Sequence, residues 1–234
     1  MKAENWERVD LWVADLFGLP ASMVWQPGVT VGMHAVLGDY PGIVVFGREG
    51  AIHVSLPDWA GRKLIDELVE VSPTDLLEPK FWATYRRTSG HKVLGPQVHS
   101  FSDTQLEPPS KVERIPASDI AHWRDVVSRR KWEASGFAEQ VEVAFAMRSG
   151  DEIAAAANLT SFRGVPSDVG VLTHPKYRGK GFSSRVARAA AAYAVRNHEI
   201  ARYRSDVDNL RSRSVSKALD FEDYFTQLTI QPRD

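Results

Sequence analysis

The chain has 234 residues, of which 43% are hydrophobic and 25% are charged, and its formal net charge is −1 at pH 7. This composition is ordinary for a globular protein, and the charge gives no overall attraction to nucleic acid or to a membrane surface. The sequence holds no cysteine, which excludes disulfides, thiolate catalysis and cysteine-based zinc sites.

The first 110 residues predict an α+β region. Apolar residues at helical intervals predict a helix over 4–17, and runs rich in Val and Ile predict strands over 30–37, 42–46 and 51–55. Helices are expected over 59–69 and 74–86, followed by a strand over 92–100. DTQLEPPS, residues 103–110, is typical of a linker because adjacent prolines lie among polar residues. We therefore predict two domains, 1–106 and 107–234.

The second half predicts helices inserted between the strands of a mixed sheet. Strands are expected over 111–115, 141–147, 152–162, 168–173, 202–207 and 224–230. Helices are expected over 118–131, from a glycine-containing loop to about Asn197, and over 209–219. This half carries 20 Lys and Arg against 16 Asp and Glu, whereas residues 1–110 carry nine against 14. The basic excess therefore belongs to the half with the glycine-containing loop.

That loop lies in HPKYRGKGFSSRVARAAAAYAV, between a predicted strand and a long helix. Gly179 and Gly181 permit positive φ angles and let backbone amides approach a ligand closely. The start of a helix leaves N–H groups unpaired, and these donors favour phosphate or diphosphate. From the residues alone, a solvated turn is an equally good interpretation. No P-loop and no G-x-G-x-x-G motif is present here, so a nucleotide triphosphatase or a dinucleotide enzyme is less favoured.

VLTHPKYRGKGFSSRV resembles the acyl-CoA-binding signature R/Q-x-x-G-x-G/A of the GNAT superfamily of N-acyltransferases, with Ser183 at the last position. The resemblance covers about residues 111–230 and is greatest for members with an extra N-terminal domain. It implies a GNAT-like mixed central sheet with flanking helices, preceded by a smaller α+β domain. A second segment, NLRSRSVSKALDF, matches the family at Asn209, Ser212, Leu219 and Phe221, while Asp220 replaces a usual Gly.

The resemblance implies that the loop amides bind the diphosphate of coenzyme A and that the preceding strand pairs with its pantetheine arm. The implied cofactor-binding residues are Val171, Leu172, Thr173, Arg178, Gly179, Lys180, Gly181, Phe182, Ser183, Ser184, Asn209 and Ser212.

Acyl transfer to an amine needs a base for the amine and a proton for the departing thiolate. Asp168, then Asp206, are the candidate bases, although a surface turn residue is an equally good interpretation of Asp168. Many family members carry a Tyr acid where this chain has Ser216, and a serine hydroxyl is a poorer proton donor than a phenol. Tyr224 or water is the alternative acid.

The function implied by the resemblance is transfer of an acyl group, expected to be acetyl, to an amine of a small molecule or a protein. Acetyl-CoA or another acyl-CoA would be the co-substrate, and no metal is expected because the seven histidines show no metal-ligand spacing. The alternative is a non-catalytic acyl-CoA-binding sensor or interaction module.

We expect no nucleic-acid partner, because no basic patch interleaved with aromatic residues appears. No apolar run approaches the roughly 20 residues that span a bilayer, and the N-terminus lacks the apolar core of a signal peptide, so a cytoplasmic protein without a membrane partner is expected. Residues 1–110 could cover the acceptor pocket, supply a homodimer surface, or form a degenerate second GNAT-like half.

Overall fold

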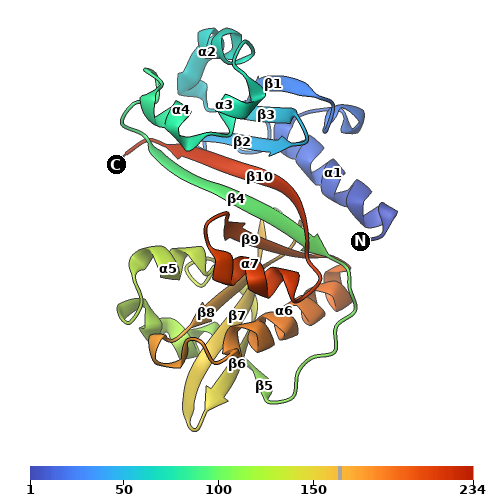
Figure 1. The fold of residues 1–234 in the computed structure, drawn as a ribbon, viewed down its shortest axis with the longest axis vertical. Coiled ribbons are helices and arrows are strands. Elements are labelled where there is room, and N and C mark those ends of the chain that lie inside the picture. Colours follow the sequence, from blue (N-terminus) through green and yellow to red (C-terminus); the bar gives the residue numbers. More distant parts are fainter. Residues whose placement is uncertain (163–164, 234) are drawn as a thin grey trace. The chain divides into compact units, whose positions relative to one another are not determined.

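The chain folds into two units that interleave in sequence (Figure 1). The computed structural model describes residues 1–162 and 165–233. Unit 1 comprises Met1–Asn5, Ser100–Arg204 and Asn209–Asp223, and unit 2 comprises Trp6–His99, Ser205–Asp208 and Tyr224–Asp234. One change of unit falls between His99 and Ser100, and the boundary at 106/107 stays a prediction. The segments 205–208 and 224–234, however, are grouped with the N-terminal residues.

Unit 1 is built on strands in the order β9-β8-β7-β6-β5. Neighbouring strands are antiparallel except β8 and β9, which are parallel. The strands are β5 Val112–Ile115, β6 Val141–Ser149, β7 Glu152–Phe162, β8 Val165–Thr173 and β9 Ala201–Asp206, whose last two residues fall in unit 2. The helices are η3 Ala117–Asp125, α5 Arg129–Ala134, η4 Pro175–Tyr177, α6 Phe182–His198 and α7 Leu210–Lys217.

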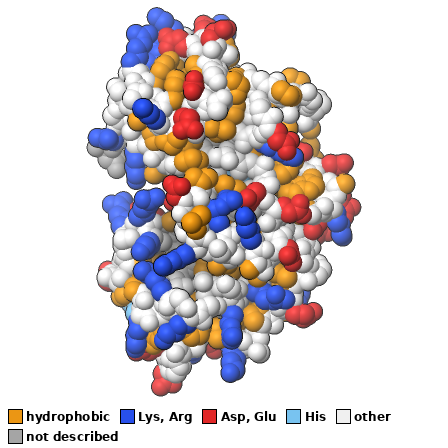
Figure 2. Space-filling view, in the orientation of Figure 1, with side chains coloured by type: hydrophobic (Ala, Val, Ile, Leu, Met, Phe, Trp, Pro, Cys, Tyr) orange, Lys and Arg blue, Asp and Glu red, His pale blue; other side chains and the backbone are white. Residues whose placement is uncertain are grey.

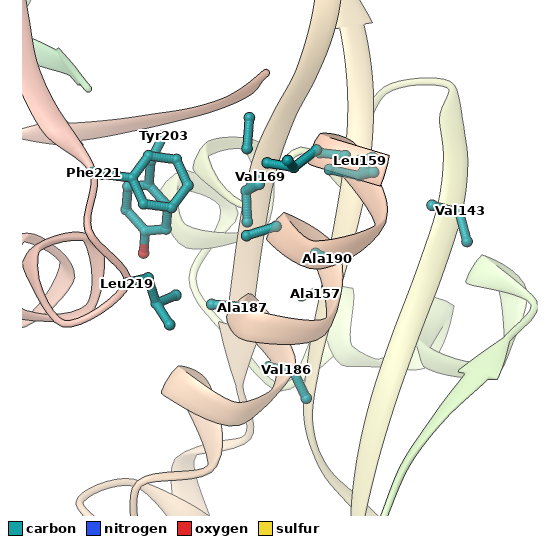
Figure 3. Close-up of a cluster of buried hydrophobic side chains, with 14 of the residues drawn as sticks. Val143, Ala157, Leu159, Val169, Val186, Ala187, Ala190, Tyr203, Leu219 and Phe221 are labelled. Carbon is teal, nitrogen blue, oxygen red and sulfur yellow. The ribbon is translucent and has the colours of Figure 1, made fainter. Parts of the chain in front are cut away.

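Helix α6 packs on one face of this sheet through small side chains (Figure 3). Ala187 and Ala190 of α6 belong to the same buried cluster as Ala157 and Leu159 of β7. Small residues on both surfaces let the helix approach the strands closely, and close packing of this kind fixes its position. The opposite face is covered by η3 and α5, whose Trp123 and Trp132 pack with alternate strand residues. Unit 1 is thus a sheet with helices on both faces.

Unit 2 contains strands in the order β1-β3-β2-β10-β4. Strand β1 is parallel to β3, whereas β2 is antiparallel to β3 and to β10. Its strands are β1 Gly28–Met33, β2 Ile43–Arg48, β3 Ala51–Leu56, β4 Lys92–Ser102 and β10 Glu222–Gln231, the last two of which have residues in both units. Its helices are α1 Ala3–Phe17, most of which lies in unit 2, η1 Ala21–Met23, η2 Asp58–Ala60, α2 Gly61–Leu68, α3 Pro73–Leu76 and α4 Pro79–Thr84.

Most predicted elements are confirmed, and the mixed α/β class is correct. Two helix predictions need correction. The segment 118–131 forms η3 and the short α5 instead of one helix, and 74–86 is divided into α3 and α4. Pro79 explains the second division, because proline disfavours helical geometry in the residue before it, and Glu78 is extended at φ −90° and ψ 120°. Within the described part of the chain, no helix is both long and apolar enough to cross a membrane.

Candidate functional site

The loop between β8 and α6 has an open backbone. Gly179 and Gly181 have φ angles of 78° and 75°, which favour glycine, and Gly181 caps α6. A Cβ atom at either position would meet nothing within 4 Å. No described side chain fills the space beside the two glycines, so this loop has room for a ligand.

The amides of this loop have few protein partners. Among described residues, none accepts a backbone bond from Gly179, Lys180 or Gly181. The first-turn amides of α6, at Phe182, Ser183 and Ser184, have no carbonyl available within the helix, and no side chain caps them. The peptide dipoles of a helix that is 17 residues long add partial positive charge at this end. The loop therefore presents donors suited to an anionic ligand.

Cationic side chains surround these donors. Arg178, Lys180 and Arg185 are exposed beside the loop, and Lys176 precedes it. Figure 2 shows Lys and Arg side chains over the part of the surface where Figure 1 draws α5, α6 and α7. These full charges reinforce the partial charge of the helix end for phosphate groups.

A buried tyrosine anchors the loop to the sheet. Tyr177 is 6% exposed, and its hydroxyl donates to the carboxylate of Glu152 at the start of β7. Lys176 donates to the same carboxylate at 2.8 Å. These two bonds hold the pKa of Glu152 below its usual value, the contact with Lys176 being the larger cause. The sequence pattern did not lead us to predict this contact. The feature that could have indicated it is the aromatic residue before Arg178 in the loop motif.

One edge of β8 is open next to the loop. Among the described residues, β8 pairs with β9 at Asp168 and Arg202 only. On its other side β8 stays paired with β7 as far as Thr173, opposite Ala155. Val171, Leu172 and Thr173 therefore offer main-chain groups along an edge that β9 does not cover, and an extended ligand can pair with such an edge.

Asn209 caps the second helix implied in binding. Its side-chain oxygen accepts from the backbone N–H of Ser212 at 3.2 Å, which is the bond a cap residue of α7 makes. The Ser212 hydroxyl lies 3.0 Å from the hydroxyl of Tyr203 in β9. Burial raises the pKa of Tyr203, which keeps this phenol protonated. Asn209 and Ser212 thus belong to unit 1, together with the glycine loop.

Asp168 lies in β8 and not in a surface turn. It is 7% exposed, and its Oδ2 accepts from Arg204 Nε at 2.6 Å and lies 3.4 Å from Arg202 Nη2. The Asp168 carboxylate raises the pKa of Arg204, while burial lowers the pKa of Arg202. Two guanidinium groups already hold this carboxylate, which makes it a poor acceptor for the proton of an amine. Sequence reasoning missed both arginines; their alternation in ARYRSD was the available signal.

Ser216 is 2% exposed in α7, and its hydroxyl donates to the carbonyl of Arg213 at 2.9 Å. This bond is the local side-chain-to-backbone contact that serine often makes in helices. The serine proton therefore has an acceptor within its own helix.

The other two predicted catalytic residues belong to unit 2. Asp206 Oδ1 accepts from Gln97 Nε2 at 3.1 Å. The Tyr224 ring stacks on Trp6 with centroids 4.1 Å apart, and Arg48 lies 3.9 Å from its centroid. The Tyr224 hydroxyl donates to Asp10 at 2.7 Å, and burial, then that bond, raises the pKa of Tyr224. The structure thus groups the predicted binding residues and Asp168 in unit 1, and Asp206 and Tyr224 in unit 2.

No group of His, Cys, Asp and Glu that could hold a metal ion occurs among the described residues.

The profile of the acetyltransferase (GNAT) domain matches residues 96–222. The chain belongs to the GNAT acetyltransferase family. The match covers the loop, β8, β9 and α7. No curated protein matches the sequence.

One of three similar solved structures superposes well enough to show a shared fold, at low sequence identity. A Drosophila protein is 15% identical, covers 81% of this chain and 74% of its own, and superposes with a TM-score of 0.51. A GCN5-related N-acetyltransferase from Kribbella flavida is 16% identical over 62% of this chain and 61% of its own, with a TM-score of 0.45. A GCN5-related N-acetyltransferase-like protein from Streptococcus suis is 15% identical over 96% and 98%, with a TM-score of 0.45.

Proposed function

We propose that this protein is an acyl-CoA-dependent N-acyltransferase, with acetyl as the acyl group, acting on an amine of a small molecule or a protein. The observation that carries the proposal is the open, cationic glycine loop at the start of α6 in a chain of the GNAT family. Its free amides fit a diphosphate, and the cations beside it fit further phosphate charge.

In this proposal, different residues bind different parts of acyl-CoA. The amides of residues 179–184 hold the diphosphate, and the open edge of β8 at Val171, Leu172 and Thr173 holds the pantetheine arm. Asn209 and Ser212 contact the ligand from the start of α7. Acyl-CoA supplies the acyl group as a thioester, whose C–S bond breaks as the C–N bond to the amine forms.

In that reaction the protein must orient the thioester, and two protons must be transferred. A backbone N–H at Leu172 or Thr173 holds the thioester carbonyl oxygen, where it stabilises developing negative charge. An acceptor amine near pKa 10 must lose a proton, and the departing thiolate must gain one. Asp168, the acidic candidate in unit 1, is held by two arginines and is therefore a poor base. Water supplies the proton to the thiolate, since Ser216 and Tyr224 donate theirs to protein oxygens.

Calorimetric titration with acetyl-CoA tests the binding half of this proposal. Saturable binding below millimolar is expected, and its absence in folded protein contradicts the proposal. Gly181→Glu should raise the Kd at least about a hundredfold, because a carboxylate enters the diphosphate site. Gly150→Glu is the matched control: Gly150 has a φ of 63° and open space around its Cβ position, and it lies in the β6–β7 turn. The control should bind acetyl-CoA like the wild type.

The second candidate function is a non-catalytic acyl-CoA sensor. The ion-paired Asp168 and the self-bonded Ser216 favour it, because neither is poised to move a proton. Incubation of acetyl-CoA with a varied amine panel, followed by detection of free thiol, separates the two. Sustained thiol release above the rate without amine supports the enzyme. Saturable binding without release across the panel supports the sensor.

A further inference from the structure

The point where β8 and β9 meet carries a buried group of charges. In parallel strands, residues in register have side chains on the same face, so Asp168 and Arg202 share a face, and Arg204 two residues on shares it as well. The same alternation places Gly170 and Leu172 on this face, and Leu172 packs with Trp123 and Trp132 of the η3–α5 layer. The charges are therefore on the side of the sheet away from α6.

The side chains of this group are tightly held. The Asp168 side chain is 9% exposed and that of Arg202 is 7%, while that of Arg204 is 36% exposed. Glu139, in the stretch after α5, is a second carboxylate whose charge acts on both guanidiniums. Buried charges are costly unless they are paired, so removing one partner leaves the others in an unfavourable state.

The neighbourhood of Asp168 leaves little room for strand movement. A Cβ atom on Gly170 would lie 2.0 Å from the carbonyl oxygen of Ser135. The Asn158 side chain of β7 donates to the same carbonyl oxygen at 2.9 Å. The residues after α5 thus press directly on β8, two residues beyond the carboxylate. Strand β8 is fixed from this face and from β7, and only its edge toward β9 is open beyond Asp168.

We propose that Asp168, Arg202 and Arg204 form a clamp that fixes the closed end of the opening between β8 and β9. By fixing it, the clamp positions the open edge of β8 for the pantetheine arm of acyl-CoA. The three residues are positioning residues and not catalytic ones, because they act on the ligand through the backbone of β8. The inference rests on the proposed function.

Two ligands separate the clamp from other roles of Asp168. Coenzyme A carries the pantetheine arm, whereas 3′-phosphoadenosine 5′-diphosphate keeps the nucleotide and the diphosphate but lacks the arm. Asp168→Asn should weaken binding of coenzyme A about tenfold, because a small misplacement of the strand edge lowers the fit of the arm. Binding of 3′-phosphoadenosine 5′-diphosphate should stay at the wild-type value, because the loop at residues 179–184 is unchanged.

Arg204→Gln is the second variant, because its side chain is partly exposed and its loss disturbs the core less. It should give the same pattern, and the double variant should bind coenzyme A no more weakly than Asp168→Asn alone, because that change already removes the ion-pair partner of Arg204. Where Asp168→Asn does not fold, Arg204→Gln decides alone. Arg148→Gln is the matched control, since it breaks an exposed 2.6 Å contact with Glu113 in the same unit and should bind both ligands normally.

The possible results have separate meanings. Unchanged coenzyme A binding in the folded variants contradicts the clamp, and it is also the result expected if Asp168 were the general base. Equal weakening of both ligands contradicts it as well, because it indicates a general loss of structure. Failure of the wild-type protein to bind either ligand contradicts the proposed function instead.

Discussion

Tyr177 ties the glycine loop to the sheet through one hydroxyl. The ring is buried against the start of α6, with the Phe182 ring centroid 6.2 Å away, and the hydroxyl reaches Glu152 in β7. The ring packs against its neighbours, and the hydroxyl group makes the hydrogen bond that orients the loop. A hydrogen bond to a carboxylate is among the stronger ones in proteins, so its loss should be measurable.

Tyr177→Phe should raise the Kd for acetyl-CoA about three- to tenfold, because the ring stays packed while the loop loses its bond to β7. Calorimetric titration measures the change. Tyr193→Phe, in α6 but 12 positions from Gly181, is the control and should bind normally. An unchanged Kd in Tyr177→Phe would show that the loop needs no anchor.

Gly170 is a second position where a single side-chain atom would change the stability of the fold. Because Gly170 has no side chain, the carbonyl oxygen of Ser135 can approach the backbone of β8. The Asn158 side chain donates a hydrogen bond to the same oxygen. Gly170→Ala should lower the free energy of unfolding by about 3 kcal/mol, because the backbone of β8 or of residue 135 must shift. Urea unfolding tests it. Gly32→Ala is the control, because that strand glycine has nothing within 4 Å of its Cβ position. Equal stability of the two variants would contradict the close contact.

At the scale of elements, α6 depends on alanine. Its buried residues include Ala187, Ala190, Ala191 and Ala194, and they face the alanine-rich centre of β7. Because the proposed binding loop lies at the start of α6, the distance between helix and sheet sets where the loop amides lie. In the proposed function, packing in the middle of unit 1 therefore influences ligand binding at the loop.

Ala190→Leu should lower the free energy of unfolding by about 2 kcal/mol, since a larger side chain in a filled interface forces the helix away from β7. Arg196→Leu introduces the same residue on the exposed side of α6 and should leave stability within about 0.5 kcal/mol of the wild type. Thermal or urea denaturation compares the three proteins. A stable Ala190→Leu variant would mean that the interface contains unfilled space.

The elements themselves follow from local patterns, and this explains which predictions were right. The alternation in 141–147, the hairpin that joins it to 152–162 and the uninterrupted helix after Gly181 are properties of neighbouring residues, and β6, β7 and α6 confirm them. A helix over 118–131 is expected because Ser118 is a suitable N-cap residue. The observed break after Asp125 leaves Trp123 and Trp132 free to pack into one cluster. Tertiary packing decides such a case, and local propensity does not reveal it.

At the scale of the whole molecule, no local sequence pattern indicates that the two units interleave along the chain. Strand β10 pairs with β2 across more than 170 residues of chain, at Ile230 and Ile43 for example. Such a pairing leaves no local sign in the sequence. Most candidate binding residues, 171–173 and 178–184, lie in one short stretch of sequence, where a local motif can indicate them. The partners of Asp168 were not predictable in this way, because Arg202 and Arg204 are 34 and 36 positions away.

Unit 2 also contains histidines that make stability depend on pH. Burial lowers the pKa of His53 and of His34 below the ordinary value of 6.5. The unfolded chain therefore binds protons in a range where these two residues, when folded, do not. The stability that depends on their neutral form is complete above pH 6.5 and is lost as the pH falls from 6.5 through their folded pKa values. The pKa of Glu67 is lowered to about 2, mainly by the hydrogen bond from Arg87. The stability that this carboxylate contributes is lost only as the pH falls below about 4.5.

Urea unfolding between pH 7.5 and pH 5 should therefore show a falling free energy of unfolding as the pH drops below 6.5. His53→Gln should flatten this dependence, whatever its effect on stability at pH 7.5. A free energy that rises on acidification from 6.5 would contradict the burial of these neutral rings.

Hydrogen exchange at individual amides tests most directly whether residues 179–184 hold the diphosphate. Addition of saturating coenzyme A should slow exchange at the amides of residues 179–184, where few protein acceptors exist, and also along the open edge of β8 at Val171, Leu172 and Thr173. Saturation of the protein with coenzyme A while the amides of residues 179–184 exchange at their ligand-free rates would contradict the account.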